Sequence, residues 1–359
     1  MDRQTTDRLT TDRQKKFSAG LLLKWTAIIL LVAAAIGYSI DVDYYLMRPG
    51  SAEHLQPLIH VEGSTGEESG RLMLTTVSSL AGNALFYVLA QFDRNTEIVP
   101  KEDVLGSTGM DDELYQKLMI MYMNQSQQDA IYNAFLLAGE AAEFVEKAVL
   151  VRDVTDDSKA KDILKPGDSI IKVDGFVMKN SEQVIEYVKS KQPGDLVAVT
   201  YERSGEQHEV EIELTENPET EEARIGVMIF TERELHTERE VQIDTGQIGG
   251  SSAGTMFTLE IYKQLIGKDI TKGHYVAGTG TINTKGQVGQ IGGVQHKVKA
   301  AYAAKADIFF VPKDILPTDS NEKDAVATNE QIGSPLVVVP IAHVQEAIDY
   351  LEKLPVKQR

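Results

Sequence analysis

The most constraining feature of the chain is an apolar stretch of 20 residues, Leu21–Ile40, in which Lys24 is the only charged residue. A helix of about 20 apolar residues spans the hydrocarbon core of a bilayer. Lys24 is close enough to the end of the stretch for its ammonium to reach the interface, and Trp25 and Tyr38 suit the two interfaces. The stretch therefore predicts one transmembrane helix over residues 21–40.

Basic residues flank this stretch unevenly. Five of them precede it, whereas Arg48 is the only one between its end and Arg71. By the positive-inside rule, residues 1–20 are a cytoplasmic tail and everything after Ile40 lies outside the membrane. A cleaved signal peptide is the competing interpretation, and the length of the apolar stretch favours a retained anchor.

Length and composition exclude several classes of protein. A chain of 359 residues suggests two or three domains. The net charge of −18 argues against a nucleic-acid partner, because a phosphate backbone requires a basic counter-surface. The absence of cysteine excludes disulfides, thiol catalysis and cysteine metal sites. Because no zinc-protease motif, calcium loop or histidine cluster occurs either, we expect no metal and no cofactor.

Residues 41–147 open the part of the chain beyond the apolar stretch. Residues 70–79 have the pattern of a strand, and residues from about 111 to 147 look helical. The helical segment contains Met119, Met121 and Met123. Methionine runs form adaptable binding surfaces in some proteins, but we interpret this one as helix core.

Residues 148–214 change to a β-rich pattern. Lys165-Pro166-Gly167-Asp168 and Val173-Asp174-Gly175 mark turns on either side of a short strand. This order resembles a bacterial PDZ domain, although no carboxylate-binding loop is recognisable before Val149. A plain β-rich packing module is the alternative. The acidic residues 215–224 that follow have the composition of a linker.

From residue 225 to residue 359 the pattern becomes α/β. Helical spacing runs from about Ser252 to Leu265 and begins again near Val294. The continuous apolar runs at 308–311 and 336–339 predict buried strands. An amphipathic helix over 343–354 closes the chain.

Two residues at expected helix starts carry the candidate chemistry. Ser252 lies in Gly249-Gly250-Ser251-Ser252-Ala253-Gly254, and Lys297 lies in Gly292-Gly293-Val294-Gln295-His296-Lys297. A serine hydroxyl becomes a nucleophile when a neighbouring base takes its proton, and a lysine with an acidic ammonium can be that base. Free N–H groups at a helix start can stabilise the resulting oxyanion. The neighbours Gly250, Ser251 and Ala253 are therefore candidate substrate-binding residues.

The surroundings of Lys297 favour its neutral form. On a helix it shares one face with Ala300, Ala301 and Ala304. Small apolar neighbours and the positive end of a helix both disfavour an ammonium. We therefore predict that the pKa of Lys297 is lowered.

The serine motif has a second interpretation. Gly250-Ser251-Ser252-Ala253-Gly254 fits G-x-S-x-G, the nucleophile elbow of α/β-hydrolases. That elbow requires a preceding strand, an acid and then a histidine. His274, His296 and His343 follow, but none stands in an obvious loop after an acid-bearing strand. An esterase therefore explains fewer residues than a Ser-Lys enzyme does.

Together the two motifs resemble the proteolytic domain of Lon proteases, in which a Ser-Ala-Gly serine and a Gly-Gly-x-x-x-Lys lysine form a dyad. Most of the likeness lies in Gly278–Pro312. The resemblance implies that Ser252 is the nucleophile, that Lys297 is the base, and that Thr279 supports the lysine.

Two positions depart from the Lon pattern. Ser251 stands where Lon enzymes usually have proline, and Gly249 stands where many have aspartate. No G-x-x-x-x-G-K-[S/T] motif, the phosphate-binding loop of ATPases, occurs in the sequence. We therefore expect peptidase activity that does not depend on ATP.

The order of anchor, PDZ-like segment and Lon-type segment is similar to that of the YlbL-like (SepM-like) membrane-anchored PDZ plus Lon-type serine proteases of Gram-positive bacteria. This resemblance implies an α/β (α+β) Lon-type proteolytic domain, residues 41–147 and 225–359. The β-rich PDZ-like domain, residues 148–214, is inserted into it, and one transmembrane helix precedes it.

The same resemblance implies a function. We expect an ATP-independent serine endopeptidase at the cell membrane that cleaves unfolded or exported peptides and proteins outside the cytoplasm. Its partners are then a peptide or protein substrate and the bilayer, and a homo-oligomeric ring is compatible with the resemblance. The alternative is a non-catalytic, membrane-anchored PDZ scaffold that binds peptides.

Overall fold

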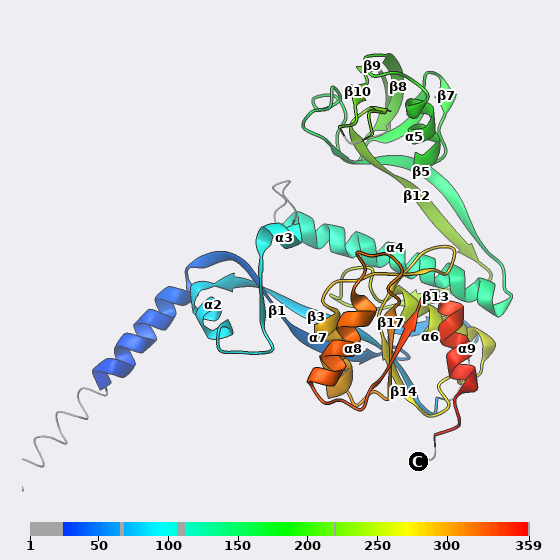
Figure 1. Cartoon of the computed structure of the whole chain (residues 1–359). Helices are drawn as coiled ribbons and strands as arrows, with labels where there is room; N and C mark the ends of the chain where they lie inside the picture. The colour runs from blue at the N-terminus through cyan, green and yellow to red at the C-terminus, as the bar shows by residue number, and fades with distance from the viewer. Residues whose placement is uncertain (1–23, 65–67, 106–111, 219, 358–359) are drawn as a thin grey trace, which may run out of the picture. The chain divides into compact units, whose positions relative to one another are not determined.

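The computed structural model describes residues 24–64, 68–105, 112–218 and 220–357. The chain divides into two compact units, which are described separately below (Figure 1). The first unit is discontinuous and consists of Met1–Gly139 and Arg239–Arg359, whereas the second is Glu140–Glu238. The second unit is therefore inserted into the sequence of the first.

The described chain begins with a helix over residues 24–38. Most of its apolar side chains are exposed, among them Trp25, Leu31 and Ile36. The helix ends at residue 38, two residues before the predicted end at Ile40. Residues 21–23 and the predicted tail over 1–20 lie outside the described residues. Within the described ranges, no helix combines the length and the apolar character needed to cross a membrane.

One six-stranded sheet forms the centre of the first unit, in the order β18-β17-β14-β3-β1-β4. β3, β14, β17 and β18 run parallel to one another, and β1 is antiparallel to β3 and β4. The strands are β1 (Asp41–His54), β3 (Arg71–Asn83), β4 (Glu97–Pro100), β14 (Tyr275–Gly278), β17 (Ile308–Pro312) and β18 (Val337–Ile341). Because β1, β3 and β4 precede the second unit and the others follow it, both halves of the first unit build one sheet.

Helices cover both faces of this sheet. α7 (Val294–Ala303) packs on β1, β3 and β14 and against α8 (Asn321–Gln331). α6 (Gly254–Ile266) packs on β3 and β14 and against α9 (Val344–Lys353). All five residues of β17 are buried, and neighbouring residues of a strand point to opposite faces. Burial on both faces explains why these strands are continuous apolar runs in the sequence.

Short elements complete the first unit. β2 (Ile59–Val61) pairs with β13 (Val241–Ile243), and β15 (Thr281–Ile282) pairs with β16 (Val288–Gly289). Two short helices, α2 (Ala84–Ala90) and α3 (Lys101–Leu105), flank β4.

A long helix, α4 (Asp112–Ala138), packs against α6. The prediction of helix as far as residue 147 was wrong. α4 ends before Gly139, whose φ of +76° is the left-handed geometry that terminates helices. The chain then enters strand β5 (Ala142–Val154), which pairs with β12 (Val227–Thr237) along its length. Strand pairing with a distant partner overrides the local helical pattern there.

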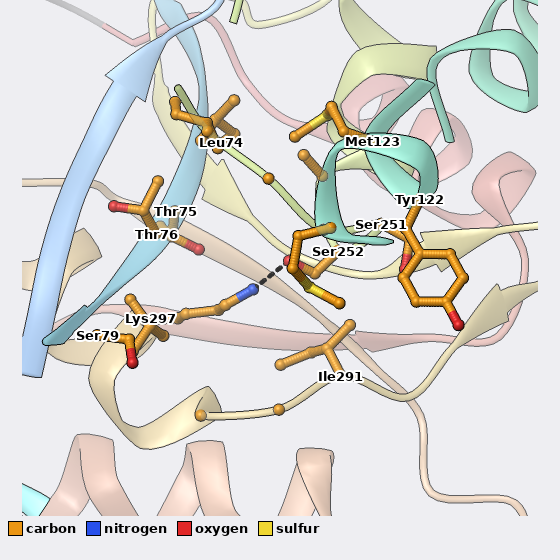
Figure 2. Close-up of a pocket in the computed structure, with 18 of the residues that line it drawn as sticks. Leu74, Thr75, Thr76, Ser79, Tyr122, Met123, Ser251, Ser252, Ile291 and Lys297 are labelled. Carbon is orange, nitrogen blue, oxygen red and sulfur yellow. Dashed lines mark hydrogen bonds between the residues drawn. The ribbon is translucent and has the colours of Figure 1, made fainter. Parts of the chain in front are cut away.

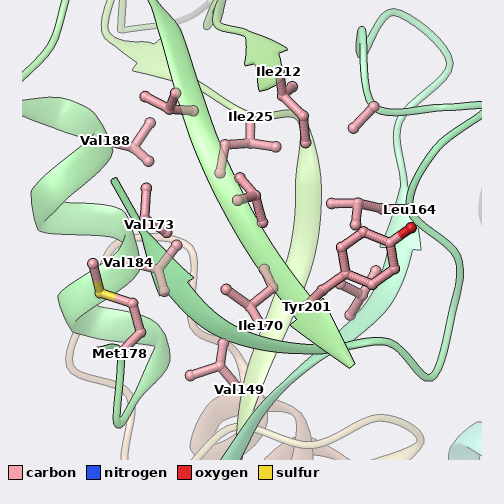
Figure 3. Packing of buried hydrophobic residues seen from close by; sticks show 14 of the residues in the cluster. Val149, Leu164, Ile170, Val173, Met178, Val184, Val188, Tyr201, Ile212 and Ile225 are labelled. Atoms are coloured by element: carbon pink, nitrogen blue, oxygen red, sulfur yellow. The ribbon is translucent and has the colours of Figure 1, made fainter. Parts of the chain in front are cut away.

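The second unit is built on a sheet in the order β12-β5-β6-β8-β9, with β7 paired to β6. The turns Asp174-Gly175 and Ser204-Gly205 have positive φ at both residues, the type I′ geometry that joins twisted strands. The remaining elements are β6 (Ser169–Val173), β7 (Phe176–Val177), α5 (Ser181–Lys189), β8 (Leu196–Arg203) and β9 (Glu206–Glu213). Val184 and Val188 of α5 pack onto this sheet in an apolar core (Figure 3).

This unit is wider than the segment 148–214 read from the sequence, because it also takes in residues 140–147 and 215–238. Where a linker was expected, β10 (Thr215–Glu216) and β11 (Ala223–Arg224) form a small antiparallel pair. The chain then returns as β12 to the edge of the sheet.

Asp168, the last residue of the Lys-Pro-Gly-Asp motif, is a buried carboxylate with several hydrogen-bond donors. Its carboxylate accepts two hydrogen bonds from the Arg203 guanidinium, at 2.7 and 2.6 Å, and a third from the Lys165 amide at 2.7 Å. The Asp168 side chain is 2% exposed. Burial acts against the charged form, but these donors outweigh it and hold the pKa of Asp168 below its ordinary value.

We expect Arg203→Ala to destabilise the second unit, because it leaves the buried Asp168 carboxylate with the Lys165 amide but without its charged partner. Hydrogen exchange of residues 140–238 under increasing denaturant measures this loss. The matched control is Lys161→Ala, which removes an exposed ion pair with Asp156 and should leave the stability nearly unchanged. Equal losses in the two variants would contradict this role of Asp168.

Candidate active site

Ser252 and Lys297 meet at the starts of two helices. Ser252 stands two residues before α6, and Lys297 lies in the first turn of α7 (Figure 2). The Nζ atom of Lys297 is 2.5 Å from the Oγ atom of Ser252. The sequence motifs that suggested a nucleophile and a base are therefore in direct hydrogen-bonding contact.

Thr279 orients the lysine. Its Oγ1 atom lies 3.0 Å from Lys297 Nζ, and its own hydroxyl donates to the Ser252 carbonyl at 3.0 Å. Because the hydroxyl proton is used in that bond, the Thr279 oxygen accepts a hydrogen from Lys297. A neutral amine that donates to Thr279 can turn its lone pair towards the hydroxyl of Ser252.

Burial sets the charge of Lys297. The residue is 3% exposed, and its helix neighbours Ala300 and Ala301 are buried as well. The removal of water from the ammonium lowers the pKa of Lys297 to about 7. At neutral pH a large fraction of this lysine is therefore an uncharged amine, the form that can take a proton.

The loop before Ser252 is held by α4. The Gly250 amide donates to the Met119 carbonyl at 2.8 Å, and the Ser126 hydroxyl donates to the Ser251 carbonyl at 2.9 Å. A Cβ atom added to Gly249 would lie 2.9 Å from the Cβ of Met119. The close approach of α4 therefore requires glycine at position 249, where many Lon enzymes carry aspartate.

Backbone donors lie beside the serine. Ala253 is the N-cap of α6, with no side-chain capping bond. In the described hydrogen-bond network, neither the Ser252 amide nor the Ala253 amide donates to a protein acceptor. Free amides at a helix start carry partial positive charge, so they suit a developing oxyanion. Gly250, Ser251 and Ala253, the predicted substrate-binding residues, all line the same cavity.

The cavity at Ser252 has a volume of about 790 Å³. One wall comes from α4, with Tyr115, Met119, Tyr122 and Met123, and the opposite wall from β3. Met119 and Met123 share a helix face because they are four residues apart. The assignment of the methionine run to helix core was therefore incomplete, since Met123 is buried and also lines the cavity.

The β3 wall offers an open strand edge. β14 pairs with β3 only as far as Leu74, which lies opposite Gly278. Beyond that point no described strand pairs with this edge of β3. Thr75, Thr76, Val77 and Ser79 all line the cavity. Backbone groups of a further extended chain can pair with such an edge.

The nucleophile-elbow hypothesis finds no histidine at the serine. None of the residues that line the cavity is a histidine. His274 bonds to the Pro355 carbonyl, His296 to Glu97, and His343 to the Lys285 carbonyl. The geometry therefore supplies a lysine, and no histidine, as the partner of the serine.

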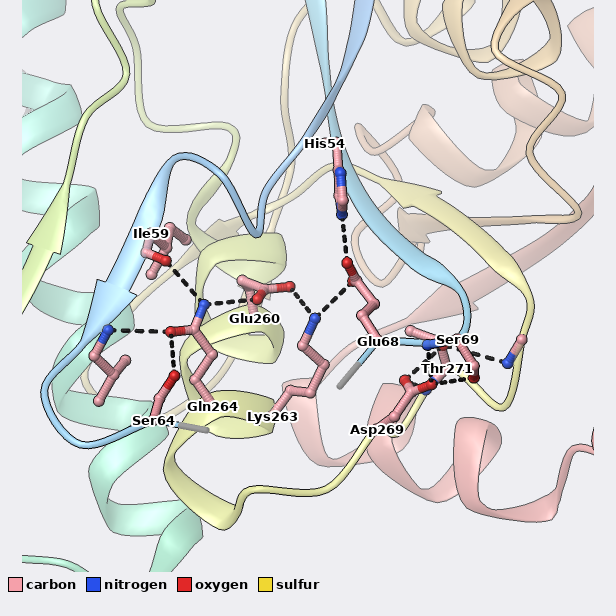
Figure 4. A network of polar contacts seen from close by, with 12 residues as sticks. His54, Ile59, Ser64, Glu68, Ser69, Glu260, Lys263, Gln264, Asp269 and Thr271 are labelled. Carbon is pink, nitrogen blue, oxygen red and sulfur yellow. Dashed lines mark hydrogen bonds and ion pairs between the residues drawn. The ribbon is translucent and has the colours of Figure 1, made fainter. Parts of the chain in front are cut away.

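A polar network fixes the other end of α6 (Figure 4). The Gln264 side chain accepts from the Val61 amide at 3.0 Å and donates to the Ile59 carbonyl at 2.9 Å. Its amide group thus satisfies two backbone groups of β2. Lys263 lies 2.7 Å from Glu68 and 2.8 Å from Glu260. Burial alone lowers the pKa of Lys263, but the two carboxylates outweigh it and hold that pKa above its ordinary value.

The second unit has a groove of its own, with a volume of about 420 Å³. Val184, Ile185 and Val188 of α5 line one side, and residues 225–229 line the other. β12 is the edge strand of its sheet on that side. No carboxylate-binding loop of a PDZ domain is recognisable in the sequence before Val149. The turn beside this groove instead holds Gly226, with a φ of +77°, far downstream in the chain.

Comparison with known proteins gives a family match for each of two parts of the chain. Residues 126–214 match the family model of the PDZ domain, and residues 217–353 match that of the Lon protease (S16) C-terminal proteolytic domain. A Lon protease of Endomicrobium trichonymphae is 29% identical over 184 residues, 50% of this chain and 18% of that protein. An archaeal Lon protease of Halobacterium salinarum is 28% identical over 120 residues, 33% of this chain and 16% of the relative.

The chain thus spans less than a fifth of the length of these curated relatives. Among solved structures, the PDZ domain of an SdrC-like protein from Listeria monocytogenes is 34% identical. It covers 23% of this chain and 86% of its own, with a TM-score of 0.22. A solved protein from Geobacillus thermodenitrificans is 38% identical, with coverages of 23% and 95% and a TM-score of 0.22. The chain therefore combines a PDZ domain with a Lon-type proteolytic domain, the domain of a serine-type peptidase.

Proposed function

We propose that the chain is a membrane-anchored serine endopeptidase that works without ATP and cleaves extended peptides outside the cytoplasmic membrane. One observation carries the catalytic part of this proposal. The Lys297 amine lies 2.5 Å from the Ser252 hydroxyl, has a pKa of about 7, and faces a cavity large enough for a peptide. A solvated lysine and an ordinary helix-capping serine have none of these properties.

The first half of the reaction uses the neutral amine. Lys297 takes the proton of the Ser252 hydroxyl as the oxygen attacks the scissile carbonyl, and the carbonyl oxygen becomes an oxyanion. The amides of Ser252 and Ala253 donate hydrogen bonds to that oxyanion. When the tetrahedral intermediate collapses, the Lys297 ammonium returns its proton to the leaving amine, and an acyl-serine remains.

The second half regenerates the enzyme. Lys297, neutral again, takes a proton from a water molecule, whose oxygen attacks the acyl carbon. Collapse breaks the bond to the Ser252 oxygen, which recovers the proton from the lysine. Thr279 holds the amine in place through both halves because its hydroxyl stays bonded to the Ser252 carbonyl.

The open edge of β3 supports extended substrates. A peptide that pairs with Thr75–Ser79 lies along one wall of the cavity and passes Ser252. Only an unfolded segment can offer its backbone in this way. Unfolding a stable domain to expose such a segment requires roughly 5–15 kcal/mol. We therefore infer that the substrates are unstructured peptides, exposed loops or tails.

The groove of the PDZ domain supports a separate recruiting contact. β12 presents a free edge there, and α5 contributes an apolar wall with Ile185 44% exposed. Lys189 and Arg224 line the groove too, and each is paired with a carboxylate, Glu222 and Asp157 respectively. An extended peptide with an apolar side chain fits this combination of a free strand edge and an apolar wall.

The anchor and the location are part of the proposal. The apolar stretch 21–40 and the uneven basic residues around it support a single-pass anchor with the catalytic unit outside the cell. Assembly into a ring stays a prediction.

A non-catalytic scaffold remains the second candidate, because Ser251 and Gly249 depart from the Lon pattern. The structure offers a reason for one departure, since α4 approaches Gly249 too closely for a side chain. The other departure, Ser251 in place of proline, leaves the contact between Ser252 and Lys297 intact. The geometry therefore favours the enzyme.

We expect Ser252→Ala to abolish cleavage of a disordered casein substrate, because only the attacking oxygen is lost. Ser251→Ala is the matched control and should keep most of the activity, since α4 holds Ser251 through its backbone. A fluorogenic casein assay on the purified full chain measures both. Reversed results would show that the register of the nucleophile is wrong.

The pH dependence should report Lys297. Because the neutral amine is the active form, kcat/KM should rise about tenfold per pH unit below pH 7 and level off above about pH 8. Lys297→Arg should be inactive at every pH in this range, since arginine stays charged. A flat profile for the unmodified enzyme between about pH 5.5 and 8.5 would contradict a lysine base.

A charged side chain introduced into the PDZ groove should impair the binding of protein substrates without affecting the catalytic step. We expect Ile185→Glu to lower kcat/KM for protein substrates several-fold and to leave short peptides unaffected, because short peptides cannot reach both sites. Leu196→Glu is the control, since Leu196 is 61% exposed and lies outside the groove. Equal loss on both classes of substrate would assign the groove a structural role.

The topology can be tested on intact cells. A protease added outside should digest the chain beyond Ile40, while an epitope placed within residues 1–20 stays protected. A cytoplasmic protein serves as the control for leakage. Protection of the C-terminal half would overturn the proposed location.

A further inference from the structure

Apolar side chains gather on the outer face of α2 and the turn after it. Val88 is 55% exposed, Leu89 52% and Phe92 84%. The Phe92 amide donates to the Leu89 carbonyl, so Phe92 continues the helical turn. At spacings of three and four residues, the three side chains share one face. Large apolar groups clustered in this way mark an interaction surface more often than isolated ones do.

The opposite side of α2 is fixed to the junction where the N-terminal helix meets β1. The rings of Phe86 and Tyr38 meet edge to face, with their centroids 6.0 Å apart. The Ala84 amide donates to the Ile40 carbonyl at 2.8 Å. α2 is therefore held against the end of the exposed apolar helix 24–38, and its three exposed apolar side chains lie on an element packed at that end.

We propose that Val88, Leu89 and Phe92 form a second membrane contact, which dips into the interfacial layer of the bilayer that holds the N-terminal helix. This inference rests on the proposed function, because it takes the anchor as given. The net charge of −18 works against electrostatic attraction of the whole body to anionic lipids. A local apolar contact can hold the body at the bilayer without electrostatic attraction. The exposed Arg94 beside this face suits a lipid phosphate.

The contact would set the height of the active site. β3 runs directly into α2, because Asn83 ends the strand and caps the helix. Ser79, which lines the catalytic cavity, lies four residues earlier on the strand, about 13 Å away at the usual rise per residue. A docked α2 would keep the near end of the cavity close to the bilayer, where segments next to membrane anchors are within reach.

The chain contains no cysteine, so single-cysteine labelling tests this directly. Full-length Gln91→Cys carries a bimane fluorophore beside Phe92 and leaves the three apolar side chains intact. Ile315→Cys, at an exposed apolar position on the loop before α8, is the control, and Leu31→Cys reports the anchor. Each is reconstituted in vesicles of phosphatidylcholine and phosphatidylglycerol, with nitroxide lipids labelled near the headgroup or deep in the chain.

We expect headgroup nitroxides to quench position 91 several-fold more than position 315, and deep nitroxides to quench position 31. Phe92→Glu in the Gln91→Cys chain should remove the quenching at 91 and leave that at 31. If position 31 is quenched while 91 behaves like 315, the second contact is wrong and the anchor stands. If neither position 31 nor position 91 is quenched, both the anchor and the second membrane contact are wrong. A blue-shifted emission at 91 that persists in detergent without lipid quenching would instead assign the face to a second copy of the chain.

Discussion

The contact between the buried amine of Lys297 and the hydroxyl of Ser252 is the interaction on which the rest of the site depends. A lysine with a pKa of about 7 has lost on the order of 5 kcal/mol of preference for its charged form relative to water. The fold has to supply that difference by excluding water. The buried alanines on the lysine's helix face do so, and Thr279 gives the amine one polar partner that carries no charge.

The serine is held from a part of the chain that the Lon-type family match does not include. That match begins at residue 217, whereas β3 and α4 both precede the inserted unit Glu140–Glu238 in sequence. α4 holds the serine loop through the Met119 carbonyl and the Ser126 hydroxyl, and β3 supplies the open strand edge. The candidate active site is thus assembled from both sides of the inserted unit, and α4 leads directly into that unit in sequence.

Much of the site was predictable because its chemistry is local in sequence. Ser252 and Lys297 each follow a glycine-rich approach to a helix, and their pairing needed only the resemblance to Lon enzymes. The contribution of α4 to the cavity wall was not predictable from the sequence. Met123 lines the cavity and Met121 does not, and only the tertiary structure distinguishes these two methionines. Residues 142–147, the first part of β5, were misread as helix for a similar reason, because the partner strand β12 lies far along the chain. The groove of the PDZ domain was missed because the turn beside it comes after an acidic stretch that looked like a linker.

The central claim is that burial makes Lys297 a neutral base at the pH where the enzyme works. Heteronuclear NMR of the full chain with ¹³C-labelled lysine can follow the side-chain carbon next to each amine as the pH is raised. The Lys297 signal is assigned by its absence in Lys297→Arg. We predict that this one signal titrates with a pKa near 7, well below the other lysines. A Lys297 signal that titrates with them, near the ordinary lysine value of about 10.4, would contradict the proposed dyad.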